Sequence, residues 1–344
     1  MKIPIIARIH SQKTSGAKSV TAAVSGNLIV AVLKMIGWTI TGSSVMLSEG
    51  IHSLADTVNQ ALLLFGIRRS ERPADDEFQY GYKQERFFWA LISACGIFFL
   101  GAGVTFYHGI GSIIQKEITH FNAWTFLILA ASFCLEGYAL LTAYKEAKHA
   151  AAGKESVYSY FKNSGDPTIL AVIYEDSAAL SGIIIASVSI FLTYITGNVI
   201  WDGIGSILIA LLLGTVAILL MMVNRRFILN KSVPRHMREK IKEALLAEGM
   251  VDEIHDFKTV MVGVDVFMVK AEIEINGHYL AENIFDDINM REEHDKIKNF
   301  QDFVRYSSAL CDRTTRSLGR EIDAMEKRII EKVPNIKHID IEAN

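Results

Sequence analysis

The chain has 344 residues, of which 50% are hydrophobic and 21% are charged, and its mean hydropathy is +0.25. The formal net charge is -3, which gives no support for nucleic-acid binding, since such proteins carry clustered positive charge. The only cysteines are Cys95, Cys134 and Cys311, too few and too dispersed for a disulfide framework or a thiolate metal cluster. Apolar and charged residues are segregated along the chain, which predicts a membrane part followed by a soluble part.

Six segments are long and apolar enough for membrane-spanning helices, which need about 20 apolar residues each. They are Val20–Thr41, Ser43–Ile67, Phe87–Ile114, Ala123–Ala143, Thr168–Thr196 and Val199–Val223. One such segment could be a buried helix of a soluble protein, but six in succession favour an all-α, six-helix transmembrane bundle. We assign residues 1–17 to an N-terminal tail and residues 18–229 to this bundle.

Lysine and arginine are concentrated in alternate loops, as the loop after the second segment shows. That loop carries Arg68, Arg69, Arg72, Lys83 and Arg86. The loops on the other side hold a single lysine, Lys116. The positive-inside rule therefore places both termini in the cytoplasm. The basic N-terminus runs into the first span without a cleavage site, so we expect no signal or transit peptide and a multi-pass protein of a prokaryotic cell (inner) membrane.

The pattern changes after the sixth segment, and residues 230–344 read as a small cytoplasmic α+β domain. Two stretches alternate apolar and polar residues, as half-buried strands do, and helical patterns precede and follow them. The expected elements are a helix at Met237–Glu248, strands at Val251–Val262 and Val266–Ile275, a helical region at Ala281–Glu331 and a strand at Lys337–Glu342. The order αββαβ predicts a ferredoxin-like fold.

Ionisable residues within membrane spans mark function by default, because they are costly there. Glu49, His52 and Asp56 share one face of the second span, and Glu175 and Asp176 are adjacent in the fifth. His52 lies roughly 14 Å and Asp176 roughly 12 Å into their antiparallel spans, so their depths are similar. A histidine with two or three carboxylates suits Zn²⁺, whereas more oxygen ligands favour Mn²⁺ or Fe²⁺. The structural alternative is a buried His–Asp pair that only ties helices together.

Other ionisable residues have less specific surroundings. Glu136, in the fourth span, is either a proton or pathway group or a carboxylate tied to a neighbouring helix. Lys34, in the first span, is expected to snorkel or to be ion-paired rather than to bind metal, and Asp202 is expected to cap a helix. Three residues of the C-terminal domain are either a metal-sensing site or plain surface residues: His255, His338 and Asp340.

The second span carries the most specific pattern, and it resembles the second-helix signature of the cation diffusion facilitators. The matching residues are Gly42-Ser43-Ser44 and Ser48-Glu49-Gly50-Ile51-His52-Ser53-Leu54-Ala55-Asp56, with Asn59-Gln60. The resemblance covers nearly the whole chain and is closest to the zinc transporter 9 branch. It also rests on Pro73–Asp76, Tyr80–Tyr82, Arg86–Gly109, Glu175–Ala179, Ile254–Asp256, Lys270–Glu272 and His338–Glu342.

The resemblance implies a homodimer that exports a divalent metal, Zn²⁺ first, from the cytoplasm in exchange for protons. It implies alternating access of a site made by His52, Asp56 and Asp176, with Glu175 as a candidate fourth ligand or a proton relay. Most zinc-transporting members have a histidine where this chain has Val172. We expect no cofactor, since the metal is substrate, and no partner beyond metal, protons, lipid bilayer and a second copy.

The loop after the second span departs from the family pattern, and other functions stay open. The family's loop histidines for a second metal are replaced by Phe78 and Tyr82, so no second site is predicted there. The alternatives are a Mn²⁺, Fe²⁺ or Co²⁺ exporter of the same fold, an ion channel, or an intramembrane metalloenzyme. A zinc protease would need His-Glu-x-x-His on a helix, and the chain has no such motif.

Overall fold

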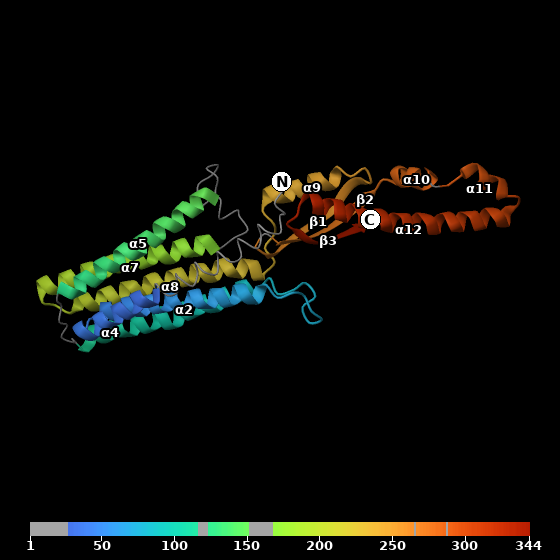
Figure 1. The fold of residues 1–344 in the computed structure, drawn as a ribbon. Helices are drawn as coiled ribbons and strands as arrows, with labels where there is room; N and C mark the ends of the chain where they lie inside the picture. Colours follow the sequence, from blue (N-terminus) through green and yellow to red (C-terminus); the bar gives the residue numbers. More distant parts are fainter. Residues whose placement is uncertain (1–26, 116–122, 151–167, 265, 287) are drawn as a thin grey trace. The chain divides into compact units, whose positions relative to one another are not determined.

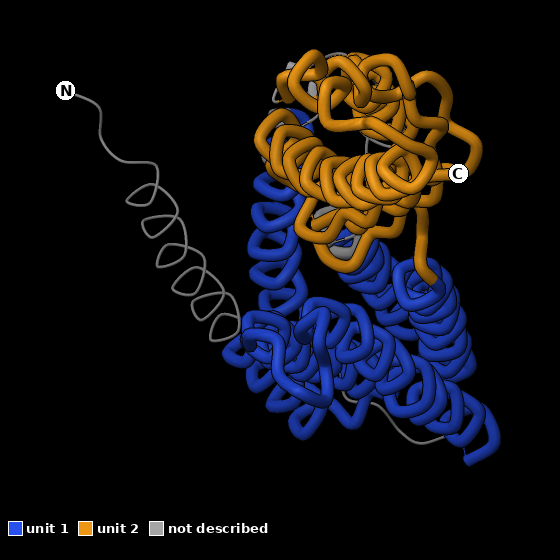
Figure 2. The backbone as a smooth tube through the Cα atoms, turned by 90° about the vertical axis from the view of Figure 1, so that its right-hand side faces the viewer, with its two compact units in different colours: residues 1–229 blue, residues 230–344 orange. Residues whose placement is uncertain are grey.

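A computed structural model describes residues 27–115, 123–150, 168–264, 266–286 and 288–344 of the chain. It divides into two compact units, Met1–Leu229 and Asn230–Asn344 (Figure 2). The regular elements described in the first unit are all helices, whereas the second unit combines helices with a small sheet.

Long helices make up the first unit, and Figure 1 shows them running side by side. A helix at Asn27–Thr41 comes first. The others are α2 (Ser44–Ser70), α3 (Glu85–Gly96), η1 (Ile97–Gly103), α4 (Val104–Gln115), α5 (Ala123–Ala150), α7 (Thr168–Thr196) and α8 (Ile200–Ile228). The segment η1 has π-helical geometry and joins α3 to α4 in one continuous span. Among the described residues, helices therefore lie where the apolar segments of the sequence predict them, while the predicted tail and the start of the first segment, at Val20, lie outside the described residues.

Four of these helices are long and apolar enough to cross a membrane: Glu85–Gln115, Thr125–Lys145, Ile173–Thr196 and Ile200–Ile228. The helix α2 has 27 residues, but the polar residues on its inner face lower its hydropathy below that of the other four. The described part of the first helix, Asn27–Thr41, is shorter. The chain is thus a multi-pass membrane protein, and a total of six spans stays a prediction.

Helix α8 lies at the centre of the bundle, where it contacts α2, α3, η1, α4 and α7. Small residues allow close approach, as between α4 and α8: a Cβ on Gly203 would lie 2.9 Å from the carbonyl oxygen of Gly109. Such small-residue contacts are typical of helix pairs in membranes. Buried apolar side chains such as Val45, Ile190 and Leu213 fill the core. The bundle therefore fixes α2 against α7 and α8 by tight packing.

The second unit is a three-stranded sheet with helices. Its elements are α9 (Arg235–Leu246), β1 (Val251–Gly263), β2 (Val266–Ile275), α10 (Gly277–Asp286), α11 (Met290–Lys296), α12 (Phe300–Lys332) and β3 (Ile336–Ala343). The strand order is β1-β2-β3, with β1 antiparallel and β3 parallel to β2. A parallel pair needs a crossover connection, which the helical region α10–α12 supplies. The small sheet with helices is as expected, and the ferredoxin-like relationship stays a prediction.

One buried carboxylate ties the turn after α9 to α12 in this unit. Glu248 accepts hydrogen bonds from Arg328 Nε and Lys332 Nζ, each at 2.8 Å. Burial acts to raise the pKa of Glu248, but the hydrogen bonds and charges of Lys332 and Arg328 outweigh it, so the pKa is lowered. A carboxyl group whose pKa is lower in the folded protein than in the unfolded chain stabilises the fold. This contribution is complete above the pKa of the unfolded chain and is lost as the pH falls through the lower pKa of the folded protein.

We expect the isolated fragment 230–344 to fold. In this fragment, Glu248→Gln should lower the free energy of unfolding by about 1 kcal/mol at pH 7. The effect is modest because water screens the partly exposed side chains of Arg328 and Lys332. The difference between the two forms should shrink as the pH falls below about 4.3, the ordinary pKa of a glutamate, and should vanish once the carboxyl group of the folded wild type is also protonated. Thermal unfolding followed by circular dichroism at several pH values measures this. A difference between the forms that persists undiminished at pH 3 would contradict the assignment.

Candidate metal site

The second-span signature forms a buried pair one helical turn apart on α2. His52 Nε2 lies 3.4 Å from Asp56 Oδ2, and the two residues are 2% and 9% exposed. Among the residues that the structure describes, neither ring nitrogen of His52 has a hydrogen-bond partner. A buried polar group normally has one, so the imidazole keeps a nitrogen lone pair free for a ligand.

Helix α7 brings two carboxylates to the same region, since it packs against α2. Glu175 is buried, and Asp176 is half-buried. Neighbouring helix positions point about 100° apart, and the two side chains accordingly have different surroundings. Glu175 Oε1 accepts a hydrogen bond of 2.6 Å from Asn59 Nδ2. Asp176 lies on a helix that contacts α5 as well as α2.

Asn59 is a positioning residue that the sequence indicated only as part of the polar face of α2. Its amide group donates to Glu175 of α7, and its carbonyl oxygen accepts from Ser93 of α3. The three side chains therefore link three helices and hold one oxygen of Glu175 in place. Ser93 was not singled out from the sequence, where its only signal is a hydroxyl group in an apolar run.

The predicted ligands occupy one region, but they do not form a closed coordination shell. In the described parts of the chain, no three His, Cys, Asp or Glu residues lie close enough to hold a metal ion. Zinc ligands approach to about 2 Å. Side-chain rotation or a shift of α7 against α2 is therefore needed to bring His52, Asp56 and Asp176 around one ion.

Lys34 is ion-paired, as expected. Its ammonium nitrogen lies 2.9 Å from Glu49 Oε2 and 2.9 Å from Ser53 Oγ, and both ionic side chains are fully buried. Glu49 shares a face with His52, but its contact is with the first helix. Glu136 is 8% exposed, and its charge interacts with those of Lys34 and Asp56.

Asp202 caps a helix as expected, but the helix is α2 rather than its own. It is fully buried, and its carboxylate accepts from Ser43 Oγ at 2.5 Å and from Ser44 N at 2.7 Å. Ser43 is the N-cap residue of α2. A carboxylate at a helix N-terminus satisfies free amide groups and opposes the positive end of the helix dipole. Asp202 thereby fixes the start of the helix that carries His52 and Asp56.

The candidate residues of the C-terminal unit are not brought together. His255 lies on β1, whereas His338 and Asp340 lie on β3, and β2 runs between these two strands. His255 Nε2 lies 3.2 Å from Glu274 Oε2, and His338 is paired with Met268 in the sheet. The sheet register therefore gives no support for a shared metal site of these three residues.

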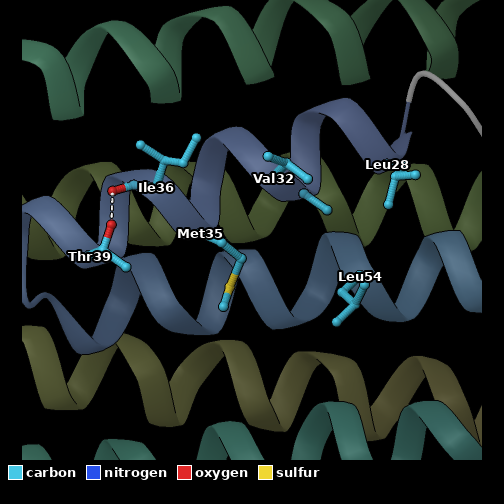
Figure 3. A pocket seen from close by; sticks show the side chains of 7 residues that line it. Leu28, Val32, Met35, Ile36, Thr39 and Leu54 are labelled. Carbon is cyan, nitrogen blue, oxygen red and sulfur yellow. Dashed lines mark hydrogen bonds between the residues drawn. The ribbon is translucent and has the colours of Figure 1, made fainter.

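A cavity of about 230 Å³ lies between the first helix and α2 (Figure 3). Its lining is apolar apart from Thr39, whose hydroxyl group donates to the carbonyl oxygen of Ile36 at 2.8 Å. The lining residues are Leu28, Ala31, Val32, Met35, Ile36, Thr39 and Leu54. None of these residues is a histidine, a cysteine, an aspartate or a glutamate, so this cavity does not belong to the candidate metal site.

Comparison with known proteins places the chain in a family. The cation efflux transmembrane domain matches residues 20–229. The chain is 36% identical to metal tolerance protein C4 of Arabidopsis thaliana, over 98% of this chain and 76% of that protein. It is 34% identical to the human proton-coupled zinc antiporter SLC30A9, mitochondrial, over 94% of this chain. The chain spans only 58% of the length of that antiporter.

A more distant relative agrees with these two. The cation-efflux pump FieF of Shewanella oneidensis is 23% identical over 75% of this chain and 81% of its own length. Two of these relatives are named as an antiporter and a pump, and the third as a metal tolerance protein, so the metalloenzyme alternative is set aside. The chain therefore belongs to the cation efflux family, the cation diffusion facilitators, near the zinc transporter 9 branch, and is a membrane transporter rather than an enzyme.

Proposed function

We propose that the chain exports a divalent metal ion, Zn²⁺ in the first place, in exchange for protons. The ion binds within the membrane between α2 and α7, and His52, Asp56 and Asp176 are its ligands. Glu175 is the fourth ligand or the proton relay. Access to this site alternates between the two sides of the membrane as the helices move.

The observation that supports this proposal best is the buried His52–Asp56 pair beside the carboxylates of α7. One imidazole with two or three carboxylates matches the preference of Zn²⁺ for nitrogen and oxygen ligands in tetrahedral geometry. Additional oxygen ligands beyond this set would favour Mn²⁺, Fe²⁺ or Co²⁺ instead. Those three ions are therefore the alternative substrates for the same site. The name of the human relative, a zinc antiporter, favours Zn²⁺.

Proton coupling follows from the chemistry of the ligands. Imidazole and carboxylate groups must lose their protons before they bind a metal ion. Metal binding from the cytoplasm releases these protons, and protons arriving from the opposite side compete the metal off. A proton gradient directed inward would then drive export.

The orientation and assembly belong to the same proposal. Positive charge in alternate loops supports cytoplasmic termini, in a cell (inner) membrane, although the name of the human relative places that protein in mitochondria. The unit Asn230–Asn344 would pair two protomers as a homodimer on the cytoplasmic side.

Zinc movement in sealed vesicles is expected to dissipate an imposed pH gradient, because the ligands exchange protons for metal. The protein is reconstituted inside-out with a trapped pH indicator, and Zn²⁺, Mn²⁺, Fe²⁺ and Co²⁺ are compared. Empty vesicles and vesicles with a Asp56→Ala variant serve as controls. Metal uptake at full rate without proton counterflow would contradict antiport, and uptake that does not saturate would favour a channel.

A further inference from the structure

A fully buried lysine is unusual in a transmembrane helix, because a charged side chain is costly there. Lys34 has no exposed surface, and its ammonium group lies between Glu49 and Ser53 of α2. These two residues precede and follow His52 on the same helix. A fixed positive charge is therefore held next to the proposed binding site of a cation.

Glu49 is enclosed between two helices. One of its oxygens, Oε2, binds Lys34 of the first helix. The other, Oε1, has no hydrogen-bond partner among the described residues, and it lies so close to Gly182 of α7 that a Cβ there would be 2.5 Å away. A larger residue at position 182 would force this carboxylate to move. Glu49 thus extends from α2 toward α7, one turn from His52. Its carboxylate is held in an ion pair with Lys34.

The charge of Lys34 extends to the proposed site. Its contacts with Glu49 and Ser53 hold the ammonium group against the stretch of α2 that carries His52. In a surrounding of low dielectric constant, a unit charge retains influence over several ångströms. Lys34 would therefore repel a divalent ion bound by His52 and Asp56, and its charge cancels the attraction that Glu49 would otherwise exert on that ion.

We propose that Lys34 is a tethered counter-cation that limits the affinity of the transport site. It repels the bound metal, and it keeps Glu49 from becoming an additional ligand. Both effects favour release of the ion on the far side, where a site that binds too tightly would stall the transport cycle. This inference rests on the proposed function, since it needs metal at His52 and Asp56.

The two members of the pair should then have opposite effects on metal affinity. Lys34→Gln removes the repelling charge but keeps a hydrogen-bond donor, and it frees Glu49 for the metal. We expect the KM for Zn²⁺ to fall roughly tenfold, with a lower maximal rate because release is slower. Glu49→Gln leaves Lys34 without its counter-charge, and the KM should rise roughly tenfold. Lys34→Arg keeps the charge and should stay near the wild-type KM.

The full-length variants are compared in proteoliposomes at one pH, and the equilibrium dissociation constant for Zn²⁺ is measured on the same proteins in detergent. Ser48→Ala is the matched control. This buried hydroxyl group next to Glu49 donates only to the carbonyl oxygen of Ser44 in its own helix, and its loss should not change the KM.

A purely structural salt bridge would lower the amount of folded protein in both neutral variants and leave the KM of the remainder unchanged. Unchanged KM, or shifts of the same sign in both variants, would overturn the inference. If one variant fails to fold, the KM of the other decides. The proposed function stands if wild-type protein transports metal and Asp56→Ala does not. If Lys34→Gln and Glu49→Gln then keep the wild-type KM, only this inference fails.

Discussion

Replacing Asp56 or Asp176 with alanine is expected to reduce metal transport at least roughly 100-fold, with normal amounts of protein in the membrane. Each change removes one ligand and one of the negative charges that offset the +2 charge of the ion. A membrane interior compensates poorly for a lost charge, so the loss should exceed that for a surface site. Zinc uptake into proteoliposomes, normalised to reconstituted protein, measures it.

Asp323→Ala is a suitable control, because this exposed aspartate of α12 lies outside the membrane unit. It should transport at the wild-type rate. His52→Ala should be nearly as damaging as Asp56→Ala, and His52→Asp should restore part of the activity and shift preference toward harder ions. Wild-type transport in both aspartate variants would mean that the site lies elsewhere, and Glu136 is then the first residue to test.

Glu175 separates two mechanisms. If it is the fourth ligand, Glu175→Gln should weaken equilibrium zinc binding about as much as Asp176→Asn. If it relays protons, binding should be spared and pH-driven exchange should slow. The hydrogen bond from Asn59 leaves one carboxylate oxygen for either role, and a glutamine side chain can still accept this bond.

The second large effect concerns stability rather than binding. Asp202→Ala is expected to destabilise the membrane unit by about 2–4 kcal/mol, because it removes the cap of α2 and leaves Ser43 and the Ser44 amide group buried without an acceptor. Asp202→Asn keeps one carbonyl acceptor and should cost less. Thermal unfolding of purified protein in detergent measures both, as a fall in Tm.

Thr215→Ala provides the comparison on the same helix. Its exposed hydroxyl group donates only to the carbonyl oxygen of Leu211, so its removal should leave the Tm close to that of the wild type. An Asp202→Ala variant with the wild-type Tm would show that the contacts with α2 contribute nothing net. The affinity of the remaining folded protein for Zn²⁺ should stay close to that of the wild type, since Asp202 does not touch the proposed ligands.

The sequence alone determined the positions of most helices and strands. A helix that crosses a bilayer needs about 20 apolar residues in succession. Such a run can be recognised from the local sequence, as in the continuous span Glu85–Gln115. The strands β1 and β2 follow from apolar–polar alternation and lie within a residue or two of their expected bounds. The pairing of His52 with Asp56 follows from helical spacing, because i and i+4 share a face.

Only the tertiary structure decided which helix each polar side chain meets. Helical periodicity puts Glu49 on the face of His52, yet its partner is Lys34 of the preceding helix. The sequence predicts that Asp202 caps a helix but does not say which one. The structure shows that it caps α2, through the amide group of Ser44, which lies 158 residues earlier in the chain. Asn59 gave no hint of Glu175. The reason is physical: periodicity reports the face of one helix, whereas a contact between helices depends on their relative rotation and depth, which packing of the whole bundle sets.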